Sequence, residues 1–599
     1  MPRIIVQKFG GTSVGDTSRI RRAAARAVAA QQDGAQVVMV VSARGKKTDE
    51  LVSLAGEFEV DPPAREMDML LATGEQESVA LMAMALREAG AEAVSLTGGQ
   101  IGISTDDTYG KARIRAISTD RLKEHLDAGR IVVAAGFQGV SDSGDITTLG
   151  RGGSDLTAAA LAAVLGAERC EIYTDVPGVF TVDPRIEPAA CKLDRIGYDE
   201  MLELASLGAG VMHSRSIEFA GKYGVPVVVR SSLTDEPGTL ITRAGVPKRP
   251  VTGLALVRDA ARVTLAGLPD RPGVMAEIFR RMADRAIPLD MVVQDLSVQG
   301  IAEVSFTVPQ EDLAGALAAA KSAVDALDGA EVTVGTDLAK ISAVGAGMPD
   351  RPGVAAKMFR TLAEIGCNVE LVTTSEIKVS CLIARDRADE AIRAVHAAFA
   401  LDQAADADAG GAPGDDHPLS PQEQRVRTVV EGLQGMEDIV VADVSLDAHQ
   451  ARLSVRPVPD RPGVLADLFE AVAGGPEDDP STGATVDMIV QNVSHAGHAA
   501  ISFTVPESEA KYAAELASAP AAAWGEGEVQ TDPHVAKLSV TGVGLRSHTG
   551  VGLKLFAALA EAQVNVQLIG TSEMRVSVVV AANEGEAAVE AVRGAFGIG

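Results

Sequence analysis

The chain has 599 residues, with 54 lysines and arginines against 82 aspartates and glutamates, which gives a formal net charge of −28. This length is too great for one hydrophobic core, so three or more domains are expected. The strong negative charge argues against nucleic acid and anionic membranes as partners. A small anionic ligand needs only a local basic pocket and is compatible with this charge.

The four cysteines form no CxxC pair, which favours a reducing, cytoplasmic setting. No apolar run reaches the roughly 20 residues that a membrane helix needs, and the chain opens on a predicted strand instead of a signal peptide. His495 and His498 flank Gly497 in a predicted hairpin turn, so we expect no metal site there.

The first stretch predicts a strand, a glycine turn and a helix. Residues 4–8 (IIVQK) form a short apolar strand that ends in a lysine, and Gly10, Gly11, Thr12 and Ser13 follow it. Glycine turns and helix starts present N–H groups that bind phosphate, and Lys8 would add a positive charge. The lysine precedes the glycines and no GK[ST] follows, so this is not a Walker loop. A tight turn beside a surface lysine is the alternative.

Five apolar runs alternate with helical stretches up to residue 245. They are residues 36–43, 91–98, 130–137, 170–176 and 225–232. Continuous apolar runs of this length suit a mostly parallel sheet covered by helices on both faces, an αβα sandwich. Ligands of such sheets bind beyond the carboxyl ends of the strands, which directs attention to the polar residues there.

Two loops after these strands carry chemistry. Residues 150–155 (GRGGSD) precede an apolar helical pattern, so we expect Ser154 or Asp155 to cap a helix whose N-terminus faces an anion. Residues 174–185 (TDVPGVFTVDPR) combine turns, acids, an aromatic ring and an arginine, which suits a purine nucleotide. By itself each segment also fits an ordinary loop. Two phosphate cradles, a nucleotide-like loop and no metal cluster together point to phosphoryl transfer.

Six motifs occur in a fixed order between residues 8 and 185: KFGGTSVG, SARGKKTDE, LLATGEQES, AGFQGV, TLGRGGSD and YTDVPGVFTVDPR. Together they resemble the catalytic domain of the aspartate kinases, within the amino-acid kinase superfamily. The resemblance implies ATP-dependent phosphorylation of the aspartate side-chain carboxylate to 4-phospho-L-aspartate, the first step of lysine, threonine and methionine biosynthesis. A carboxylate nucleophile is already ionised at neutral pH, so positioning and charge neutralisation are the main tasks.

The resemblance also implies roles for individual residues. The catalytic residues would be Lys8, Arg151 and Asp155, with Lys8 neutralising the transferring phosphoryl group. Glu75 would hold the substrate ammonium and Arg151 the α-carboxylate, although from sequence alone Glu75 could be a helix-capping acid. The substrate site would comprise Ser42, Thr48, Glu75, Arg151, Gly152, Gly153 and Ser154. The ATP site, with Mg²⁺ accompanying the nucleotide, would comprise Lys8, Gly10, Gly11, Thr12, Ser13, Thr174, Asp175, Phe180, Asp183 and Arg185.

The C-terminal 350 or so residues repeat a pattern. LPDRPGV at 268–274 recurs as MPDRPGV at 348–354 and as VPDRPGV at 458–464. NVELVTTSEIKVS at 368–380 recurs as NVQLIGTSEMRVS at 565–577. A two-module unit is therefore duplicated, which gives four modules.

Each module reads as strand, glycine turn, helix, two strands and helix, the start of a ferredoxin-like βαββαβ fold. The first module, 262–336, has all six elements, whereas the second, 337–400, lacks its last strand. We predict that the spare strand 251–259 completes the second module, so that the first is nested within it. The predicted regions are a kinase domain at 1–245, a first pair at 251–400, a linker at 401–425 and a second, similarly nested pair at 426–599.

These modules resemble the ACT modules that bind amino acids in aspartate kinases. The resemblance implies lysine or threonine, or both, as allosteric inhibitors bound between paired modules, and a homodimer or higher homo-oligomer formed through them. By matching, the first pair's site would include Asp270, Gly273, Asp290, Gln294, Asn368, Val369, Ser375 and Glu376. The second pair's site would include Asp460, Gly463, Asp487, Gln491, Asn565, Val566, Ser572 and Glu573.

One departure leaves another class of function open. Many relatives have a nucleotide-binding lysine where this chain has Gly210, and another lysine such as Lys222 would have to replace it. An amino-acid sensor with an inactive kinase domain is therefore the alternative. The intact catalytic residues oppose it. A homoserine dehydrogenase fusion fails because the repeats fill the C-terminal half, and glutamate or acetylglutamate kinases do not explain GRGGSD together with four modules.

Overall fold

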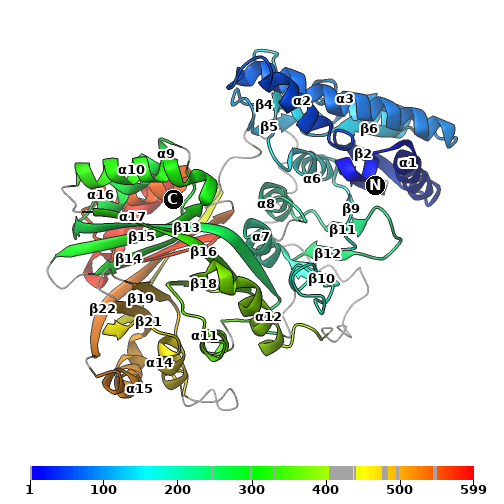
Figure 1. Ribbon diagram of the computed structural model, residues 1–599. Coiled ribbons are helices and arrows are strands. Elements are labelled where there is room, and N and C mark those ends of the chain that lie inside the picture. The colour runs from blue at the N-terminus through cyan, green and yellow to red at the C-terminus, as the bar shows by residue number, and fades with distance from the viewer. Residues whose placement is uncertain are drawn as a thin grey trace.

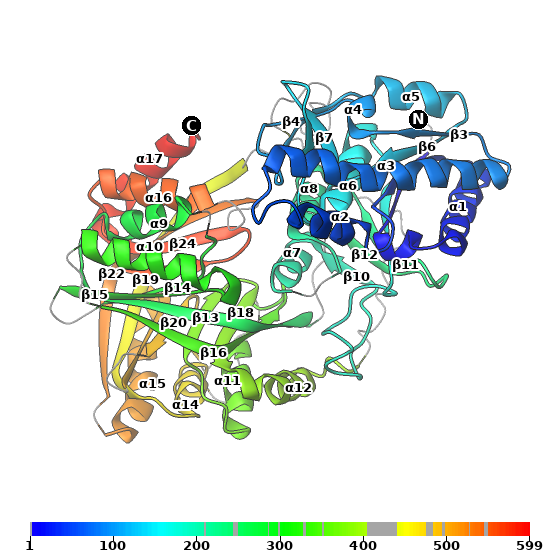
Figure 2. The same ribbon diagram turned by 45° about the horizontal axis from the view of Figure 1, so that its top comes forward.

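The computed structural model describes most of the chain as an N-terminal α/β domain (blue to cyan) beside a C-terminal region of four modules (green to red) (Figure 1, Figure 2). The described residues are 3–208, 211–243, 249–285, 287–296, 300–327, 331–349, 351, 353–403, 436, 440–474, 483–493, 498–525, 527–543 and 549–598. Among them, no helix has both the length and the apolar character needed to cross a bilayer.

The N-terminal domain is built on an eight-stranded sheet of order β10-β12-β11-β9-β1-β2-β6-β3. Its strands are β1 (Ile4–Phe9), β2 (Gln36–Val41), β3 (Ala93–Leu96), β6 (Ile131–Ala135), β9 (Arg169–Thr174), β10 (Arg195–Gly197), β11 (Val227–Ser231) and β12 (Thr239–Thr242). Neighbouring strands are parallel except β11 and β12. The predicted mostly parallel sheet is confirmed.

Helices cover both faces of this sheet, as the apolar runs predicted. Val37, Met39 and Val41 share a core with α1 (Thr17–Gln32) and α3 (Ala64–Glu88). The side chains that alternate with them on β2 face a second core, formed with α6 (Gly153–Leu165), α7 (Tyr198–Ser206) and α8 (Ser214–Tyr223). The predicted αβα sandwich is therefore confirmed.

The sequence did not predict the small second sheet of the domain, which has the order β5-β4-β7-β8. Its strands are too short to show a periodic pattern. They are β4 (Ile103–Thr105), β5 (Ile114–Ile117), β7 (Gln138–Ser141) and β8 (Ile146–Thr148). The remaining short elements are η1 (Gly11–Val14), α2 (Lys47–Gly56), α4 (Gly98–Ile101) and α5 (Asp120–Asp127).

The C-terminal region forms one twelve-stranded sheet of order β14-β15-β13-β16-β18-β17-β20-β21-β19-β22-β24-β23. The strands are β13 (Gly253–Pro269), β14 (Asp290–Leu296), β15 (Ile301–Pro309), β16 (Glu331–Val344), β17 (Leu371–Ser375), β18 (Lys378–Ala384), β19 (Val440–Pro459), β20 (Ile489–Val493), β21 (His498–Pro506), β22 (Glu528–Val543), β23 (Leu568–Thr571) and β24 (Arg575–Ala581). The helices are α9 (Val274–Ala283), α10 (Leu313–Ala326), α11 (Val354–Glu364), α12 (Ala388–Ala398), α14 (Val464–Val472), α15 (Ala510–Ala523), α16 (Thr549–Glu561) and α17 (Gly585–Phe596).

Strand pairing confirms the two nested pairs. In β13, residues 253–257 pair with residues 340–344, the half of β16 that continues into the second module. The later residues of β13 pair with the beginning of β16 and complete the first module. The second pair repeats this arrangement, because residues 440–447 of β19 pair with residues 537–543 of β22. Each of these four long strands therefore serves two modules.

The packing between the pairs was not predicted. Strand β17 of the second module pairs with β20 of the third, and α11 packs against α14. The helices of the first and fourth modules, α9, α10, α16 and α17, share another core. Figures 1 and 2 both show these helices together, with those of the second and third modules on the other side of the region. The first module thus packs with the fourth, and the second with the third.

A buried carboxylate joins the two halves of the molecule. Glu203 of α7 is fully buried and accepts a hydrogen bond of 2.8 Å from Lys378 Nζ, at the start of β18. The other oxygen of Glu203 accepts a 2.9 Å bond from the backbone N–H of Glu573. A single side chain of the N-terminal domain therefore contacts the second and the fourth modules at once.

Lys378→Met should destabilise the protein, because it leaves the fully buried charge of Glu203 without its partner. Breaking such a pair costs about 3–5 kcal/mol of unfolding free energy, measured by urea denaturation. The double variant Glu203→Gln/Lys378→Met should recover part of this loss. Arg21→Met, which breaks the exposed Arg21–Glu88 pair, is the matched control and should have little effect. A Lys378→Met variant as stable as that control would contradict the prediction.

Candidate active site

The predicted site residues gather at the carboxyl ends of four adjacent central strands. Lys8 lies near the end of β1, Ser42 directly follows β2, Gly136 follows β6, and Thr174 ends β9. The N-terminus of α6, with Ser154 and Asp155 in its first turn, faces the same edge. The sheet thus brings together residues that are up to 166 positions apart in the sequence (Lys8 and Thr174), as ligand sites of parallel sheets require.

Lys8 and Asp155 form the central ion pair of this site. Lys8 Nζ lies 2.6 Å from Asp155 Oδ1, and the two side chains are only 12% and 10% exposed. A cation held at a strand end by the first turn of a helix is positioned to neutralise a phosphoryl group. The structure therefore brings together two of the three predicted catalytic residues.

Two glycines permit the close packing of these loops. A Cβ on Gly11 would lie 2.7 Å from the carbonyl oxygen of Ala43, and one on Gly136 would lie 2.6 Å from Ser154 Oγ. No side chain fits at either position. Gly10 donates its N–H to the Tyr173 carbonyl at a long 3.4 Å, and Ser13 Oγ donates to the same oxygen at 3.4 Å. The glycine turn is therefore held between β2 and β9.

Helix α3 contributes two buried carboxylates, seven residues apart and so on one face of the helix. Asp68 is fully buried and accepts hydrogen bonds from Gly110 N–H and from the N–H and hydroxyl of Thr148, which fixes the loop leading to Arg151. Glu75 Oε1 accepts a 2.9 Å bond from Ala43 N–H. The sequence analysis missed Asp68, since nothing distinguishes it from an exposed acid until α3 is packed.

Glu75 has the properties of a ligand-binding acid. It lies in the middle of the 25-residue helix α3, so the helix-cap alternative is wrong. Its side chain is 3% exposed, and its buried Oε2 has no hydrogen-bond partner among the described residues. Burial raises the pKa of the Glu75 carboxyl to about 7. An incoming ammonium group would satisfy Oε2 and stabilise the ionised form.

The GRGG segment differs in detail from the prediction. The N-cap of α6 is Gly152, at φ 72°, and neither Ser154 nor Asp155 caps the helix. A Cβ on Gly152 would collide with His213, which the sequence analysis missed. His213 lies beside Arg151 and Asp155, and burial lowers its pKa. Arg151 is exposed and makes no ion pair with the described part of the chain, which leaves its guanidinium available to a ligand.

The predicted nucleotide residues lie in and after β9. Thr174 Oγ1 donates to Asp175 Oδ1 at 3.0 Å, and Phe180 is half-buried. The 88% exposed Arg185 is paired with Asp183 at 2.6 Å, and its hydrogen bonds hold the pKa of Asp183 below the usual value. Thr12 is exposed in η1, and Thr48 lies in the first turn of α2. Their assigned roles stay predictions.

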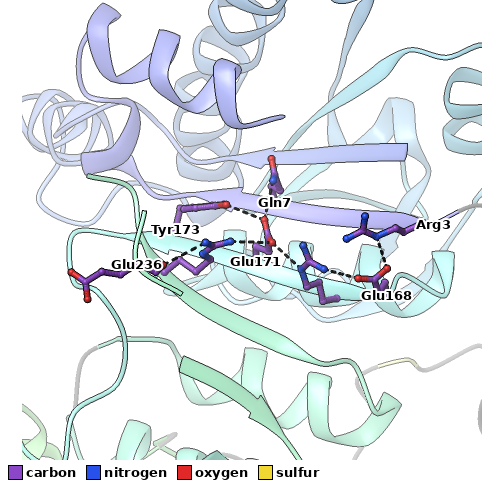
Figure 3. Close-up of polar contacts among 8 residues, drawn as sticks. Arg3, Gln7, Glu168, Glu171, Tyr173 and Glu236 are labelled. Carbon is purple, nitrogen blue, oxygen red and sulfur yellow. Dashed lines mark hydrogen bonds and ion pairs between the residues drawn. The ribbon is translucent and has the colours of Figure 1, made fainter. Parts of the chain in front are cut away.

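A network of ion pairs and hydrogen bonds supports β1 and β9 beneath the site (Figure 3). The buried carboxylate of Glu171 accepts bonds from Gln7 Nε2 at 2.9 Å and from the Tyr173 hydroxyl at 3.0 Å, and it pairs with Arg169 at 2.9 Å. Burial alone would raise the pKa of Glu171, but these bonds and the Arg169 charge hold it below the usual value. Tyr173 stacks on Phe9 at 4.6 Å. The strand ends that carry Lys8 and Thr174 are therefore rigidly aligned.

The loop after β9 is braced by the second module, a contact that sequence reasoning missed. Thr181 Oγ1 lies 3.0 Å from the buried Nε2 of His396 in α12, and the Thr181 carbonyl accepts a 2.7 Å bond from Leu254 N–H. Arg393 Nε donates to the Ile186 carbonyl at 3.0 Å. The predicted nucleotide loop therefore touches the regulatory region directly.

The predicted effector residues are brought together in a different grouping. Asn565 Nδ2 of the fourth module donates to Asp270 of the first at 2.8 Å, and Asn368 Nδ2 of the second donates to Asp460 of the third at 2.7 Å. The sequence analysis had placed Asp270 with Asn368 in one site. Each of these two hydrogen bonds joins a module of one pair to a module of the other, and the assignment of these residues to effectors stays a prediction.

The same two regions each contain a buried glutamine. Gln294 and Gln491 are 3% and 5% exposed, and the Oε1 atom of each has no hydrogen-bond partner among the described residues. Gln491 Nε2 donates to the Val369 carbonyl at 3.2 Å, across the boundary between the second and third modules. Gly273 and Gly463, at φ 96° and 97°, form the turns that face Ala560 and Ala363 of the opposite pair.

Other predicted effector residues have partners within the protein. Asp290 pairs with Lys340, and Asp487 with Lys537, each within its own pair. The sequence TSE occurs in two hairpins, at 374–376 and at 571–573, which include Ser375 and Ser572. Glu376 of the first hairpin pairs with Arg575, and the Glu573 N–H of the second donates to Glu203. Both TSE hairpins therefore lie at the junction with α7. Gly210 lies outside the described residues. Lys222 donates to the Met436 carbonyl at 3.0 Å, which gives no support for its proposed nucleotide role.

Comparison with known proteins identifies both parts of the chain. The amino acid kinase family model matches residues 3–231, and the ACT domain model matches residues 263–324, 341–399 and 538–596. The third module has the same order of elements in the structure although that model does not match it.

Solved and curated relatives agree with these matches. An aspartokinase of Geobacillus stearothermophilus is 50% identical over 400 residues, which cover 66% of this chain and 97% of the relative. An aspartate kinase from Synechocystis matches 99% of this chain and 98% of its own, with 41% identity and a TM-score of 0.51. E. coli aspartokinase III matches 66% of this chain and 99% of its own at 27% identity, with TM-scores of 0.58 in complex with aspartate and ADP and 0.52 with lysine and aspartate. Sharing half of its aligned residues with a relative that it covers almost completely, this chain belongs to the aspartokinase family.

Proposed function

We propose that this chain is a feedback-regulated aspartate kinase, a phosphotransferase that uses ATP to phosphorylate the side-chain carboxylate of L-aspartate. The observation that carries the proposal is the buried Lys8–Asp155 pair at the edge of the sheet, together with Glu75 of α3, whose Oε2 has no hydrogen-bond partner among the residues that the structure describes. The first is suited to a phosphoryl group and the second to an amino acid. The E. coli relative solved with aspartate and ADP supports the same pair of substrates.

In this proposal the chain positions two substrates and neutralises charge. Glu75 accepts the α-ammonium of aspartate, and the guanidinium of Arg151 binds its α-carboxylate with two hydrogen bonds. The side-chain carboxylate then attacks the γ-phosphorus of ATP, and the bond to the β–γ bridging oxygen breaks. Lys8 stabilises the charge on the transferring group, while Asp155 holds the lysine in place. The substrate arrives ionised, so no residue has to act as a base.

Mg²⁺ would bind together with the nucleotide phosphates rather than at a site made only of protein ligands. Within the described residues, no group of three or more histidine, cysteine, aspartate or glutamate side chains gathers to hold a metal. Asp155 is a buried carboxylate at the strand ends, and it is paired with Lys8. Magnesium sites in such enzymes commonly use one or two carboxylates together with substrate phosphates and water, which this donor set fits. The ion would neutralise phosphate charge.

For regulation, we propose two effector sites, one between the first and fourth modules and one between the second and third. The supporting observations are the two Asp–Asn hydrogen bonds between modules and the buried glutamines Gln294 and Gln491, whose Oε1 atoms have no hydrogen-bond partner in the described part of the chain. An amino-acid ammonium would satisfy such an oxygen, and the turns at Gly273 and Gly463 offer N–H groups to a carboxylate. E. coli aspartokinase III has been solved in complex with lysine and aspartate in its T-state. Lysine or threonine, or both, and a homo-oligomeric assembly are proposed on this basis.

The direct test is a coupled assay of ADP release with aspartate, with and without lysine and threonine. An active kinase inhibited by either amino acid supports the proposal. An amino-acid sensor with an inactive kinase domain, the alternative favoured by Gly210, would bind the effectors by calorimetry and release no ADP above background.

Lys8→Ala should lower kcat by about 10²–10³, because a buried phosphate-neutralising charge is lost while the sheet is unchanged. Lys511→Ala removes an exposed lysine in α15 and is the control. Circular dichroism should show both variants folded. A Lys8→Ala enzyme with half the wild-type kcat would remove Lys8 from the mechanism.

The kcat/KM for aspartate should rise with pH and level off above about 7. The raised pKa means that Glu75 is protonated below about 7 in the free enzyme, where it cannot accept an ammonium group. Above that pH it is ionised and competent to bind. Glu75→Gln should raise the aspartate KM and abolish this pH step, with a smaller effect on the ATP KM. A wild-type profile that is flat between pH 6 and 8 would contradict the assignment.

A double-mutant cycle tests the crosswise grouping of the effector sites. Asn368→Ala and Asp460→Ala should be non-additive in their effect on the inhibition constant, because the two residues share one site. Asn368→Ala and Asp270→Ala should be additive, because they belong to different sites. The reverse pattern would restore the grouping of Asp270 with Asn368.

A further inference from the structure

Asp68 of α3 is a fully buried carboxylate that binds two separate segments of the chain. Its Oδ1 accepts hydrogen bonds from the Thr148 hydroxyl at 2.7 Å and from the Gly110 N–H at 3.0 Å. Its Oδ2 accepts a second bond from the same Gly110 N–H at 2.9 Å and one from the Thr148 N–H at 2.8 Å. One side chain therefore uses both of its oxygens to join the end of β8 to the loop between β4 and β5.

The backbone that follows β8 is fixed by further hydrogen bonds. Leu149 N–H donates to the Phe137 carbonyl at 2.8 Å. The Leu149 carbonyl accepts a 2.5 Å bond from Arg215 Nη1 of α8. The Gly150 carbonyl accepts a 3.0 Å bond from the Gly153 N–H, which closes the turn. The chain therefore leaves β8 along a single defined path.

Arg151 is the next residue on this path, and its side chain is exposed. The turn that precedes it lies against the Gly110 loop, because a Cβ on Gly150, at φ 78°, would be 3.0 Å from the Gly110 carbonyl oxygen. Asp68 thus holds both the strand end that leads to Arg151 and the loop against which its turn packs. Loss of the Asp68 bonds would release both of these supports.

Helix α3 also relates Asp68 to Glu75. The two acids are seven residues apart, so they lie on one face of the helix and about 10 Å apart along its axis. Glu75 Oε1 holds the loop after β2 through the Ala43 N–H. The helix packs against β8 and runs past the small sheet (Figure 2). One helix therefore sets the place proposed for the substrate ammonium relative to the place proposed for its α-carboxylate.

We propose that Asp68 is a positioning residue for aspartate, which acts through Arg151 and does not touch the substrate. This inference rests on the proposed role of Arg151 in binding the α-carboxylate. A guanidinium group forms two hydrogen bonds with a carboxylate only when the two planar groups are aligned. Because the Arg151 side chain is exposed, its alignment depends on the backbone that carries it. A backbone that is fixed before aspartate arrives lowers the ordering cost of binding.

The test measures aspartate binding to the full-length protein by isothermal titration calorimetry. Asp68→Asn keeps the shape of the side chain but replaces one acceptor oxygen with an NH₂ group, which would face N–H donors. The Kd for aspartate should rise roughly tenfold, because hydrogen bonds to the carboxylate are lost and donors are left unpaired. The Kd for ADP with Mg²⁺ should be unchanged, since the residues assigned to the nucleotide belong to other loops.

Two substitutions in β8 separate positioning from a general loss of stability. Thr148→Val removes only the hydroxyl bond to Asp68, so it should weaken aspartate binding by a smaller factor than Asp68→Asn. Thr147→Val is the matched control. Thr147 is also buried, but its hydroxyl pairs with Thr105 Oγ1 at 2.6 Å. This control should bind aspartate like wild type, even if its thermal stability falls as much as that of Thr148→Val.

A double-mutant cycle identifies the residue through which Asp68 acts. Arg151→Ala should weaken aspartate binding by itself, and adding Asp68→Asn to it should cause little further loss, because the group that Asp68 positions is already absent. Full additivity of the two losses would overturn the proposal. Equal losses of aspartate and ADP affinity in Asp68→Asn would also overturn it, since they would indicate a purely structural role.

The result can be separated from the test of the proposed function. A protein that shows the expected pattern of aspartate binding but releases no ADP would reject the kinase activity and support the positioning role. A protein that phosphorylates aspartate and shows additive losses in the cycle would retain the kinase activity and reject the positioning role. An Arg151→Ala variant that binds aspartate like wild type would reject both the role of Arg151 and that of Asp68.

Discussion

The regulatory region depends on four strands that are each shared by two modules. Residues 253–257 of β13 belong to the second module's sheet, while the end of the same strand belongs to the first. Strands β16, β19 and β22 are divided in the same way. Backbone hydrogen bonds fix the register of each shared strand in both modules. The two modules of a pair are therefore joined by two continuous strands.

Both proposed effector sites lie between modules of the same chain. The first and fourth modules meet at the Asp270–Asn565 bridge, and the second and third meet at Asp460–Asn368. An amino acid that binds at either bridge contacts both pairs at once. Its differential affinity for two arrangements of the pairs is then the free energy available for regulation.

Two contacts connect this region to the proposed kinase site. Glu203 binds Lys378 and the Glu573 N–H, so α7 is attached to both TSE hairpins. Thr181 and Ile186 are held by α12, so the loop assigned to the nucleotide is attached to the second module. Rotation of the pairs would therefore act on α7 and on that loop together. Lys8 lies on the central strand β1, which the Glu171 network keeps aligned, and Asp155 reaches it from the first turn of α6.

The sequence by itself determined the features that depend on residues close to one another in the chain. The glycine turn after β1 and the apolar runs of the parallel sheet required only local pattern and backbone sterics. The nested strand 251–259 was predictable because one module visibly lacked a strand. Family motifs supplied Glu75, and its proposed role is supported by its burial and by an Oε2 atom that lacks a hydrogen-bond partner within the described ranges.

The tertiary structure alone decided which modules meet. All four modules carry nearly the same pattern of strands and helices, so the pattern favours a neighbour in sequence no more than a distant copy. The choice depends on complementary surfaces that are far apart in the sequence, 92 residues for Asn368 with Asp460 and 295 residues for Asp270 with Asn565. Asp68, His213 and Glu203 were missed for the same reason. Each is an ordinary polar residue in the sequence, and its role arises from partners that only packing brings within hydrogen-bond distance or electrostatic range.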